Sequence, residues 1–154
     1  MIIWFTGQPG SGKTTLANST IKALSKDNAD LKIINLDGDD LRLINKNKDY
    51  SKEGRIKNIS TAISIMRFLA NKNYTCVVSI VAPYKFLRDE LKGEFDFIEV
   101  YLHTTEIRGR EDFFAKDYEI PTDPKHLAID TGKLTIKESL DEILDVYRKM
   151  ATVA

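Results

Sequence analysis

A glycine-rich octapeptide directly after a short apolar run is the feature that most restricts how this chain can fold. Gly7-Gln8-Pro9-Gly10-Ser11-Gly12-Lys13-Thr14 follows the apolar run 2–5 and precedes a segment of helical period. A glycine-rich turn between a strand and a helix lets backbone N–H groups converge on a phosphate, and the helix N-terminus adds about half a positive charge. The sequence therefore predicts a P-loop, a site for the phosphates of a nucleoside triphosphate.

The residue types within this loop have separate tasks. The glycines supply backbone geometry, Lys13 reaches the β- and γ-phosphates as a mobile charge, and the Thr14 hydroxyl is suited to Mg²⁺. Kinases, GTPases and motor ATPases share such a loop, so the loop alone does not choose among them. The residues that we expect to bind phosphate are Gly7, Pro9, Gly10, Ser11, Gly12, Lys13, Thr14 and Thr15.

Short runs rich in Ile and Val alternate with segments of helical period along the chain, a pattern typical of a parallel sheet covered on both faces. We expect an α/β fold, the P-loop NTPase three-layer sandwich, with about five parallel strands and helices on both faces. Apolar stripes predict helices over about 14–25 and 52–72, and a capping box at 135–138 predicts a closing helix over 136–147. The expected strands are 2–5, 32–36, 76–81, 97–102 and 127–129.

Length and composition restrict the class of protein. The 154 residues suit a single domain, 1–154, and no apolar run approaches the roughly 20 residues of a membrane helix. Twenty-three basic residues balance 23 acidic ones, so we expect neither nucleic acid nor a membrane surface as partner. The first residues lack the basic flank of a signal peptide, and we expect a cytoplasmic protein.

A few other residues lie outside the expected chemistry. The single cysteine, Cys76, has no partner for a disulfide or a zinc site and is expected in the core. His103 and His126 are interpreted as structural, since neither has a partner visible in the sequence. The polar stretches 45–49 and 116–125 are expected to be mobile loops.

Charged residues follow the second expected strand. Asp37-Gly38-Asp39-Asp40-Leu41-Arg42 comes directly after strand 32–36, at the carboxyl end where open α/β sheets hold their ligands. The carboxylates there are suited to accept a proton from an attacking hydroxyl or to bind a Mg²⁺ water, or alternatively to cap a helix before a solvated arginine. Arg55 and Asn58 share one face near the start of helix 52–72, where Arg55 would bind an anion or form a surface salt bridge.

The remaining sequence favours a small-molecule kinase. A GTPase needs an Asn-Lys-x-Asp type element after an apolar strand, and the stretch 45–48 does not follow one. Motor ATPases are usually much larger. Two alternatives stay open beside a nucleotide kinase: a P-loop kinase of another small metabolite, and a nucleotide-binding module without turnover.

The chain resembles the adenylylsulfate (APS) kinase family, which phosphorylates the ribose 3′-hydroxyl of APS with ATP. The matches run in order over nearly the whole chain: the loop 7–15, Leu36-Asp37-Gly38-Asp39 with Arg42, Tyr50-Ser51 with Arg55 and Asn58, Ser79 through Pro83-Tyr84 with Arg88, the strand 97–102, Tyr118-Glu119-Ile120-Pro121 and Asp130-Thr131.

The resemblance implies a role for each matched position. ATP and Mg²⁺ would be the cofactors, a small nucleotide would be the acceptor, and a homodimer is allowed. Asp37 and Asp39 would lie near the reacting hydroxyl and the metal, and Tyr50 would take the place of a phenylalanine that stacks on the acceptor base. The implied set comprises catalytic Lys13, Asp37 and Asp39, metal-binding Thr14 and Asp37, and acceptor-binding Asp39, Arg42, Tyr50, Arg55, Asn58, Ala82 and Pro83.

Departures from the family pattern fall on the acceptor side. The family's basic lid, of the kind Lys-Gly-Leu-Tyr-Lys-Lys-Ala-Arg, is shortened and rewritten here as 104–117, where Arg108 and Arg110 are the candidates for closing over the phosphates or else are solvated charges on a helix. Ala82 replaces a usual serine, and Ser60-Thr61 replaces a frequent arginine pair. Similar divergent homologues phosphorylate cytidine diphosphoramidate in capsule biosynthesis, so the acceptor is expected to be that nucleotide, with plain APS as the alternative.

Overall fold

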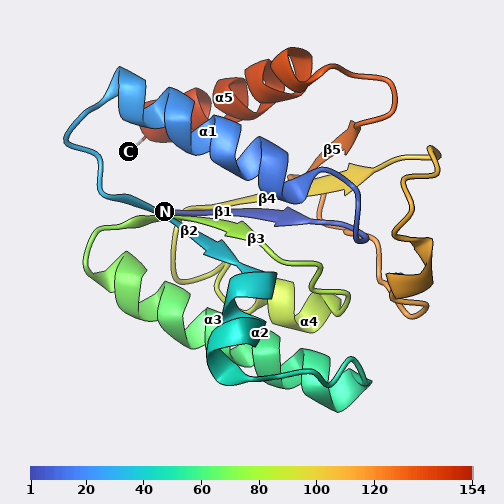
Figure 1. Ribbon diagram of the computed structural model, residues 1–154. Coiled ribbons are helices and arrows are strands. Elements are labelled where there is room, and N and C mark those ends of the chain that lie inside the picture. Colours follow the sequence, from blue (N-terminus) through green and yellow to red (C-terminus); the bar gives the residue numbers. More distant parts are fainter. Residues whose placement is uncertain (154) are drawn as a thin grey trace.

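The computed structural model describes residues 1–153 as a five-stranded sheet between two layers of helices (Figure 1). All neighbouring strands are parallel, in the order β2-β3-β1-β4-β5. The strands are β1 (Ile2–Thr6), β2 (Ile33–Asp37), β3 (Thr75–Ser79), β4 (Phe97–His103) and β5 (Leu127–Asp130). The helices are α1 (Lys13–Asp27), α2 (Gly38–Asn45), α3 (Lys52–Asn71), α4 (Lys85–Asp89), the short 3₁₀ helix η1 (Glu111–Phe113) and α5 (Ile136–Val153).

Each face of the sheet has its own hydrophobic cluster. Helices α1 and α5 cover one face, where Leu16, Leu24 and Ile143 pack on alternate residues of the strands. Helices α2, α3 and α4 cover the other, with Ile63 and Met66 of α3 in its cluster. Because both faces are buried, the strands read as continuous apolar runs rather than as an alternation. The predicted α/β three-layer architecture is confirmed.

The closing helix begins as predicted, at a reciprocal capping box. The Thr135 Oγ1 accepts from the amide of Glu138 at 3.1 Å, and a Glu138 carboxylate oxygen accepts from the amide of Thr135 at 3.0 Å. The pattern of Ile136, Leu140, Ile143 and Tyr147 also predicts one apolar face for this helix, and its first member is wrong. Ile136 remains 55% exposed, because it lies in the first turn, before α5 reaches the sheet.

The predicted strand 76–81 is two residues too long at its end. β3 stops at Ser79, and the next two carbonyls bond to side chains instead of a neighbouring strand: Ile80 O accepts from Trp4 Nε1 at 3.3 Å, and Val81 O accepts from Thr6 Oγ1 at 2.6 Å. Ala82 then takes φ +44°, which turns the chain away from the sheet. The apolar pattern continued past the strand because this segment lies against the protein and not in solvent.

Both stretches predicted as mobile loops are anchored, and apart from Asn45, the last residue of α2, they are irregular. Asn47 accepts from Arg42 and donates to Gly54 O, which ties 45–49 to the neighbouring helices. Glu119 N donates to Pro83 O at 2.8 Å, which ties 116–125 to the segment after β3.

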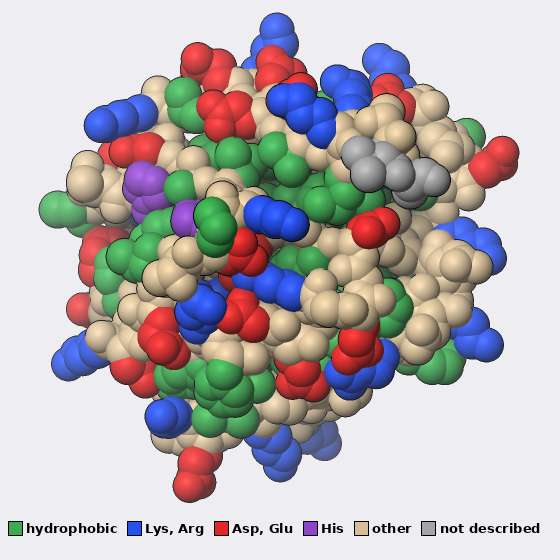
Figure 2. Space-filling model, turned by 180° about the vertical axis from the view of Figure 1, so that it is seen from behind, with side chains coloured by type: hydrophobic (Ala, Val, Ile, Leu, Met, Phe, Trp, Pro, Cys, Tyr) green, Lys and Arg blue, Asp and Glu red, His purple; other side chains and the backbone are tan. Residues whose placement is uncertain are grey.

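Cys76 lies in the core as expected, and burial raises the pKa of its thiol to about 11. Within residues 1–153, no helix has the length and apolar character needed to cross a bilayer. Acidic and basic side chains are intermixed over the face seen in Figure 2, as the balanced composition leads one to expect.

Candidate active site

The phosphate loop leaves the end of the central strand β1 and leads into α1 (Figure 1). Gly7, Gly10 and Gly12 all have φ between +83° and +150°, a range that side chains disfavour. At Gly7 a Cβ atom would lie 2.3 Å from Leu102 O, so only glycine fits there. Gly12 is the N-cap of α1 with no side-chain cap, and the N–H groups of the first helical turn, which lack partners within the helix, are suited to bind an anion.

The Lys13 ammonium is folded back onto its own loop. It donates to Gly7 O at 3.0 Å and to Gln8 O at 2.9 Å, and lies 3.4 Å from Ser11 Oγ. Burial lowers its pKa to about 8, an effect only partly offset by the nearby carboxylates of Asp39 and Asp37. The Lys13 ammonium group therefore lies among backbone carbonyl oxygens, which are weaker partners for a cation than the oxygens of a phosphate.

Three oxygen-bearing side chains converge where α1 faces the end of β2. One carboxylate oxygen of Asp37 accepts from Thr14 Oγ1 at 3.0 Å and from Ser79 Oγ at 3.0 Å. A hydroxyl and a carboxylate are the ligand types that Mg²⁺ prefers, with water and substrate phosphates completing its coordination. No cluster of three or more His, Cys, Asp or Glu suited to a metal occurs among the described residues.

The second oxygen of Asp37 caps α2. It accepts from the Asp39 amide at 2.9 Å, so Asp37 has the capping role that was the alternative interpretation and also faces Thr14. Asp39 itself lies in the first turn of α2 with an exposed side chain that lines the cleft. The cap therefore fixes the direction in which the Asp39 backbone enters the helix.

A cleft of about 510 Å³ joins the phosphate loop to these carboxylates and to the predicted acceptor residues. This volume is within the usual range of small-molecule sites. Of the residues that the sequence assigned to phosphate, metal or acceptor, all but Gly7 and Ser11 line it. Its further walls are Gly38, Ile59, Ser79, Ile80, Val81, Arg108, Arg110 and Phe113.

The acceptor end of the cleft carries two arginines and an exposed aromatic ring. The Arg42 guanidinium lies 4.0 Å from the centre of the Tyr50 ring and donates to Asp49 O at 3.0 Å. Arg55 Nε donates to Tyr50 O at 2.9 Å. Within the described chain Arg55 makes no salt bridge, so that alternative is wrong, and the end of its guanidinium group remains available to an anion.

The far wall of the cleft is built by Asn58 of α3 and by Ala82 and Pro83 after β3. Asn58 is 4% exposed and its Nδ2 lies 3.5 Å from Gly38 O, which links α3 to the start of α2. Arg88 Nη1 donates to Ala82 O at 2.6 Å and so holds the left-handed conformation of this alanine, which non-glycine residues rarely adopt.

The rewritten lid lies against the phosphate loop. Arg108 Nη1 donates to Gly10 O and to Thr131 Oγ1, each at 3.0 Å, and the Arg108 side chain pairs with Glu106. Arg110 Cβ and Cγ lie 3.3 Å from where a Cβ on Gly10 would stand. The alternative placed both charges on a helix, which is wrong because residues 108–110 are not helical. Arg108 is bonded to the phosphate loop and so is not a free solvated charge, whereas Arg110 is exposed and lines the cleft.

Sequence reasoning missed three residues of this region. Ser79 is the third partner of the Thr14–Asp37 pair, and it was missed because the predicted strand 76–81 placed it inside the strand and not at its end. Phe113, 57% exposed, adds an aromatic ring to the cleft. Gln8 bonds twice to the backbone of Ala115, which no local pattern indicates.

Comparison with known proteins agrees with this geometry. A family model described as adenylylsulphate kinase matches residues 1–124. The adenylyl-sulfate kinase of Lactiplantibacillus plantarum is 30% identical over an alignment that covers 94% of this chain and 79% of that protein. The structure of Mycobacterium tuberculosis APS kinase in complex with AMPPNP and APS has a TM-score of 0.77 at 22% identity, with 96% of each chain covered.

The fold itself extends beyond that family. A gluconokinase from Sinorhizobium meliloti has a TM-score of 0.70 at 19% identity, with 99% of this chain and 94% of that chain covered. Fold similarity therefore leaves the acceptor open, whereas the family match includes the sequence of the site. The expectation of an ATP-dependent phosphotransferase that uses Mg²⁺ and acts on an alcohol group is confirmed at the level of the family. The chain belongs to the adenylylsulphate kinase family.

Proposed function

We propose that this chain transfers the γ-phosphate of ATP to the ribose 3′-hydroxyl of a nucleotide whose 5′ end carries a second anionic group. The observation that carries the proposal is the joining, in one cleft, of the phosphate loop, the Asp37–Asp39 carboxylates and the arginine–tyrosine end. A donor site, a proton acceptor and an anion site are the three parts that such a transfer requires.

In the proposed reaction the 3′-oxygen forms a bond to the γ-phosphorus while the bond from that phosphorus to the β-bridging oxygen breaks, and ADP leaves. Asp39 takes the proton of the hydroxyl. Lys13 turns from Gly7 O and Gln8 O to the transferring phosphate, and Arg108 and Arg110 close over it. Thr14 and Asp37 would hold Mg²⁺, which supplies charge neutralisation on the phosphates.

At the acceptor end, Arg55 and Arg42 bind the 5′ anionic group and Tyr50 stacks on the base. Arginine forks suit sulfate and phosphate alike. An aromatic face accepts any base, whereas discrimination needs hydrogen bonds to base edges. These residues therefore favour a class of acceptor, a nucleotide with a 5′ diphosphate-like group, without selecting adenine.

Within this class we propose cytidine diphosphoramidate as the preferred acceptor. The supporting observation is the lid: the segment 104–117 lacks the basic run of the family and is instead a compact turn, in which a Glu111 carboxylate accepts from the amides of Arg108, Gly109 and Arg110. Plain APS is the second candidate, favoured by the similarity to curated adenylyl-sulfate kinases.

The two acceptors are separated by their kcat/KM values at fixed ATP. We expect 3′-phosphorylation of both nucleotides, with the larger value for cytidine diphosphoramidate. An APS value that is the larger of the two and lies within the roughly 10⁴–10⁸ M⁻¹s⁻¹ of ordinary enzymes would restore plain APS kinase activity. If neither nucleotide supports ADP release, the proposed class of acceptor is excluded, and a kinase of another small metabolite is favoured.

A further inference from the structure

A short irregular segment after the lid bonds to both walls of the cleft without lining the cleft itself. We call residues 115–119 the strap. None of Gln8, Ala115, Tyr118 and Glu119 is among the residues that line the cleft. The contacts of these four residues nevertheless join the phosphate loop to residues 81–83 after β3. We call residues 81–83 the acceptor wall, because Ala82 and Pro83 line the acceptor side of the cleft.

The first anchor of the strap is Gln8 of the phosphate loop. Its amide nitrogen donates to Ala115 O at 2.8 Å, and its amide oxygen accepts from Ala115 N at 2.9 Å. Ala115 is 3% exposed and Gln8 is half-buried, so both bonds are partly buried. This two-point contact fixes the strap in position and orientation against the loop, as strand neighbours fix one another.

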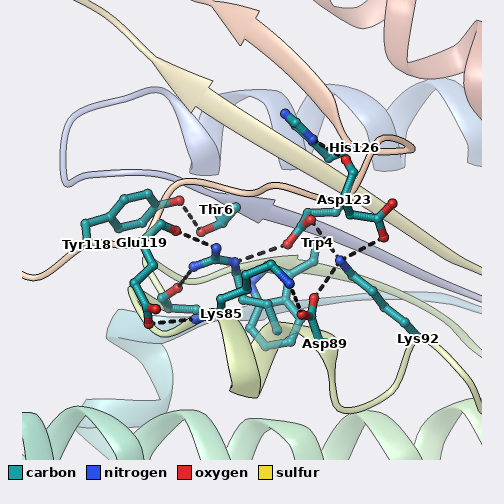
Figure 3. Close-up of polar contacts among 12 residues, drawn as sticks. Trp4, Thr6, Lys85, Asp89, Lys92, Tyr118, Glu119, Asp123 and His126 are labelled. Atoms are coloured by element: carbon teal, nitrogen blue, oxygen red, sulfur yellow. Dashed lines mark hydrogen bonds and ion pairs between the residues drawn. The ribbon is translucent and has the colours of Figure 1, made fainter.

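The middle anchor is the Tyr118 hydroxyl (Figure 3), which lies 2.7 Å from the fully buried Thr6 Oγ1. Thr6 donates its one hydroxyl proton to Val81 O at 2.6 Å, so Tyr118 must be the donor to Thr6. Tyr118 also stacks on Tyr101, with ring centres 5.8 Å apart. The strap is thereby tied to the end of β1 and to the acceptor wall at once.

The last anchor is Glu119, which bonds the acceptor wall through its backbone. Glu119 N donates to Pro83 O at 2.8 Å, and its carbonyl accepts from Arg88 Nη2 at 2.5 Å. The same guanidinium holds Ala82 O and a Glu99 carboxylate. Figure 3 shows Glu119 beside Tyr118 at the left of the view, and Lys92 with its ion pairs at the right.

We propose that Gln8 is a positioning residue, which acts through the strap to fix the separation between the phosphate loop and the acceptor wall. In-line transfer depends on the distance between the 3′-oxygen and the γ-phosphorus, so small displacements of either wall reduce the rate. The strap also continues directly from η1, and Gln8 therefore steadies Phe113 and the lid arginines as well.

The kinetic test is Gln8→Leu, which removes both bonds at similar volume. This kinetic test, unlike the exchange measurement below, rests on the proposed function. Its acceptor is whichever of APS and cytidine diphosphoramidate the unmodified protein phosphorylates. Two lost bonds predict a fall in acceptor kcat/KM of about 10- to 30-fold, with the Kd of ATP changed by less than about 3-fold. Thr20→Val is the matched control, since it removes the buried bond to Leu16 O inside α1 and should leave both constants unchanged.

A second measurement needs no acceptor. NMR hydrogen exchange in Gln8→Leu should be faster by about 10-fold or more at the Ala115 amide, which loses its acceptor, and also at the Glu119 amide, whose partner Pro83 O is untouched. Faster exchange at Glu119 shows that the strap moves as one unit. Tyr118→Phe, which removes only the middle anchor, should speed both amides by a smaller factor, and it serves if Gln8→Leu fails to fold.

Three results would overturn the proposal: an acceptor kcat/KM within 2-fold of the unmodified protein, a Kd of ATP weakened as much as the acceptor constant, or unchanged exchange at Glu119. Absence of turnover by the unmodified protein with both nucleotides would instead refute the proposed function, and the exchange experiment would still decide the role of Gln8.

Discussion

Binding of Mg·ATP should draw a proton onto Lys13 at mildly alkaline pH. In the free protein, burial lowers the pKa of this ammonium group to about 8, so at pH 8 about half of the molecules carry a neutral Lys13. A triphosphate in the loop presents anionic oxygens in place of Gly7 O and Gln8 O, which favours the charged form and raises the pKa again. Each binding event at pH 8 should then take up about half a proton, and at pH 7 only about a tenth of one.

The sign of the accompanying change in affinity is fixed by the same argument. The charged form binds better, so the affinity for Mg·ATP should fall as pH rises above about 8, by up to about tenfold per pH unit until the pKa of the bound state is reached. Titration calorimetry in two buffers of different ionisation enthalpy measures the proton uptake directly. Lys13→Met should lose the half proton at pH 8. No uptake by the unmodified protein, or equal uptake by the variant, would refute this assignment.

Three further predictions each concern the substitution of one residue. Asp39→Asn should leave the KM of ATP within a few fold and lower transfer to any acceptor by about 10²-fold or more; a change in the ATP constant alone would make Asp39 structural. Arg88→Met, which cuts the buried bonds to Glu99, Ala82 and Glu119, should lower the unfolding free energy in a urea titration by about 3 kcal/mol. Arg67→Met, which removes two exposed ion pairs, should lower it by less than about 1 kcal/mol. Thr135→Ala should lower the unfolding free energy by about 1 kcal/mol through loss of the cap of α5, and equal stability would show that the cap contributes nothing.

The elements that carry strong local signals could be predicted from the sequence. β1, the phosphate loop and α1 follow from one continuous pattern of apolar run, glycines and helical stripe. The 20-residue helix α3 has a long apolar stripe, and α5 has its capping box. The convergence of Thr14 and Asp37 was predictable as well, since both lie at the carboxyl edge of a parallel sheet.

Contacts between distant segments could not be predicted in this way. The bonds from Gln8 to Ala115 join residues 107 apart in sequence, and nothing near either residue indicates the other. The helices α2 and α4, of eight and five residues, are too short to show a full period of apolar positions. The apolar residues Ile80 and Val81 were mistaken for strand because a sequence records burial but not the partner of each carbonyl.

The position of β1 in the sheet also governs the order in which the fold can be completed. The first strand of the chain is the central one, and Ile2 pairs with Cys76 on one side and with Phe97 on the other. During synthesis the phosphate loop thus precedes both strands that support it, β3 and β4, the second of which is complete only after about a hundred further residues. Closing such long loops before any pairing is gained slows folding and leaves the apolar strand exposed meanwhile. The part of the sequence easiest to recognise is therefore among the last to become structurally secure.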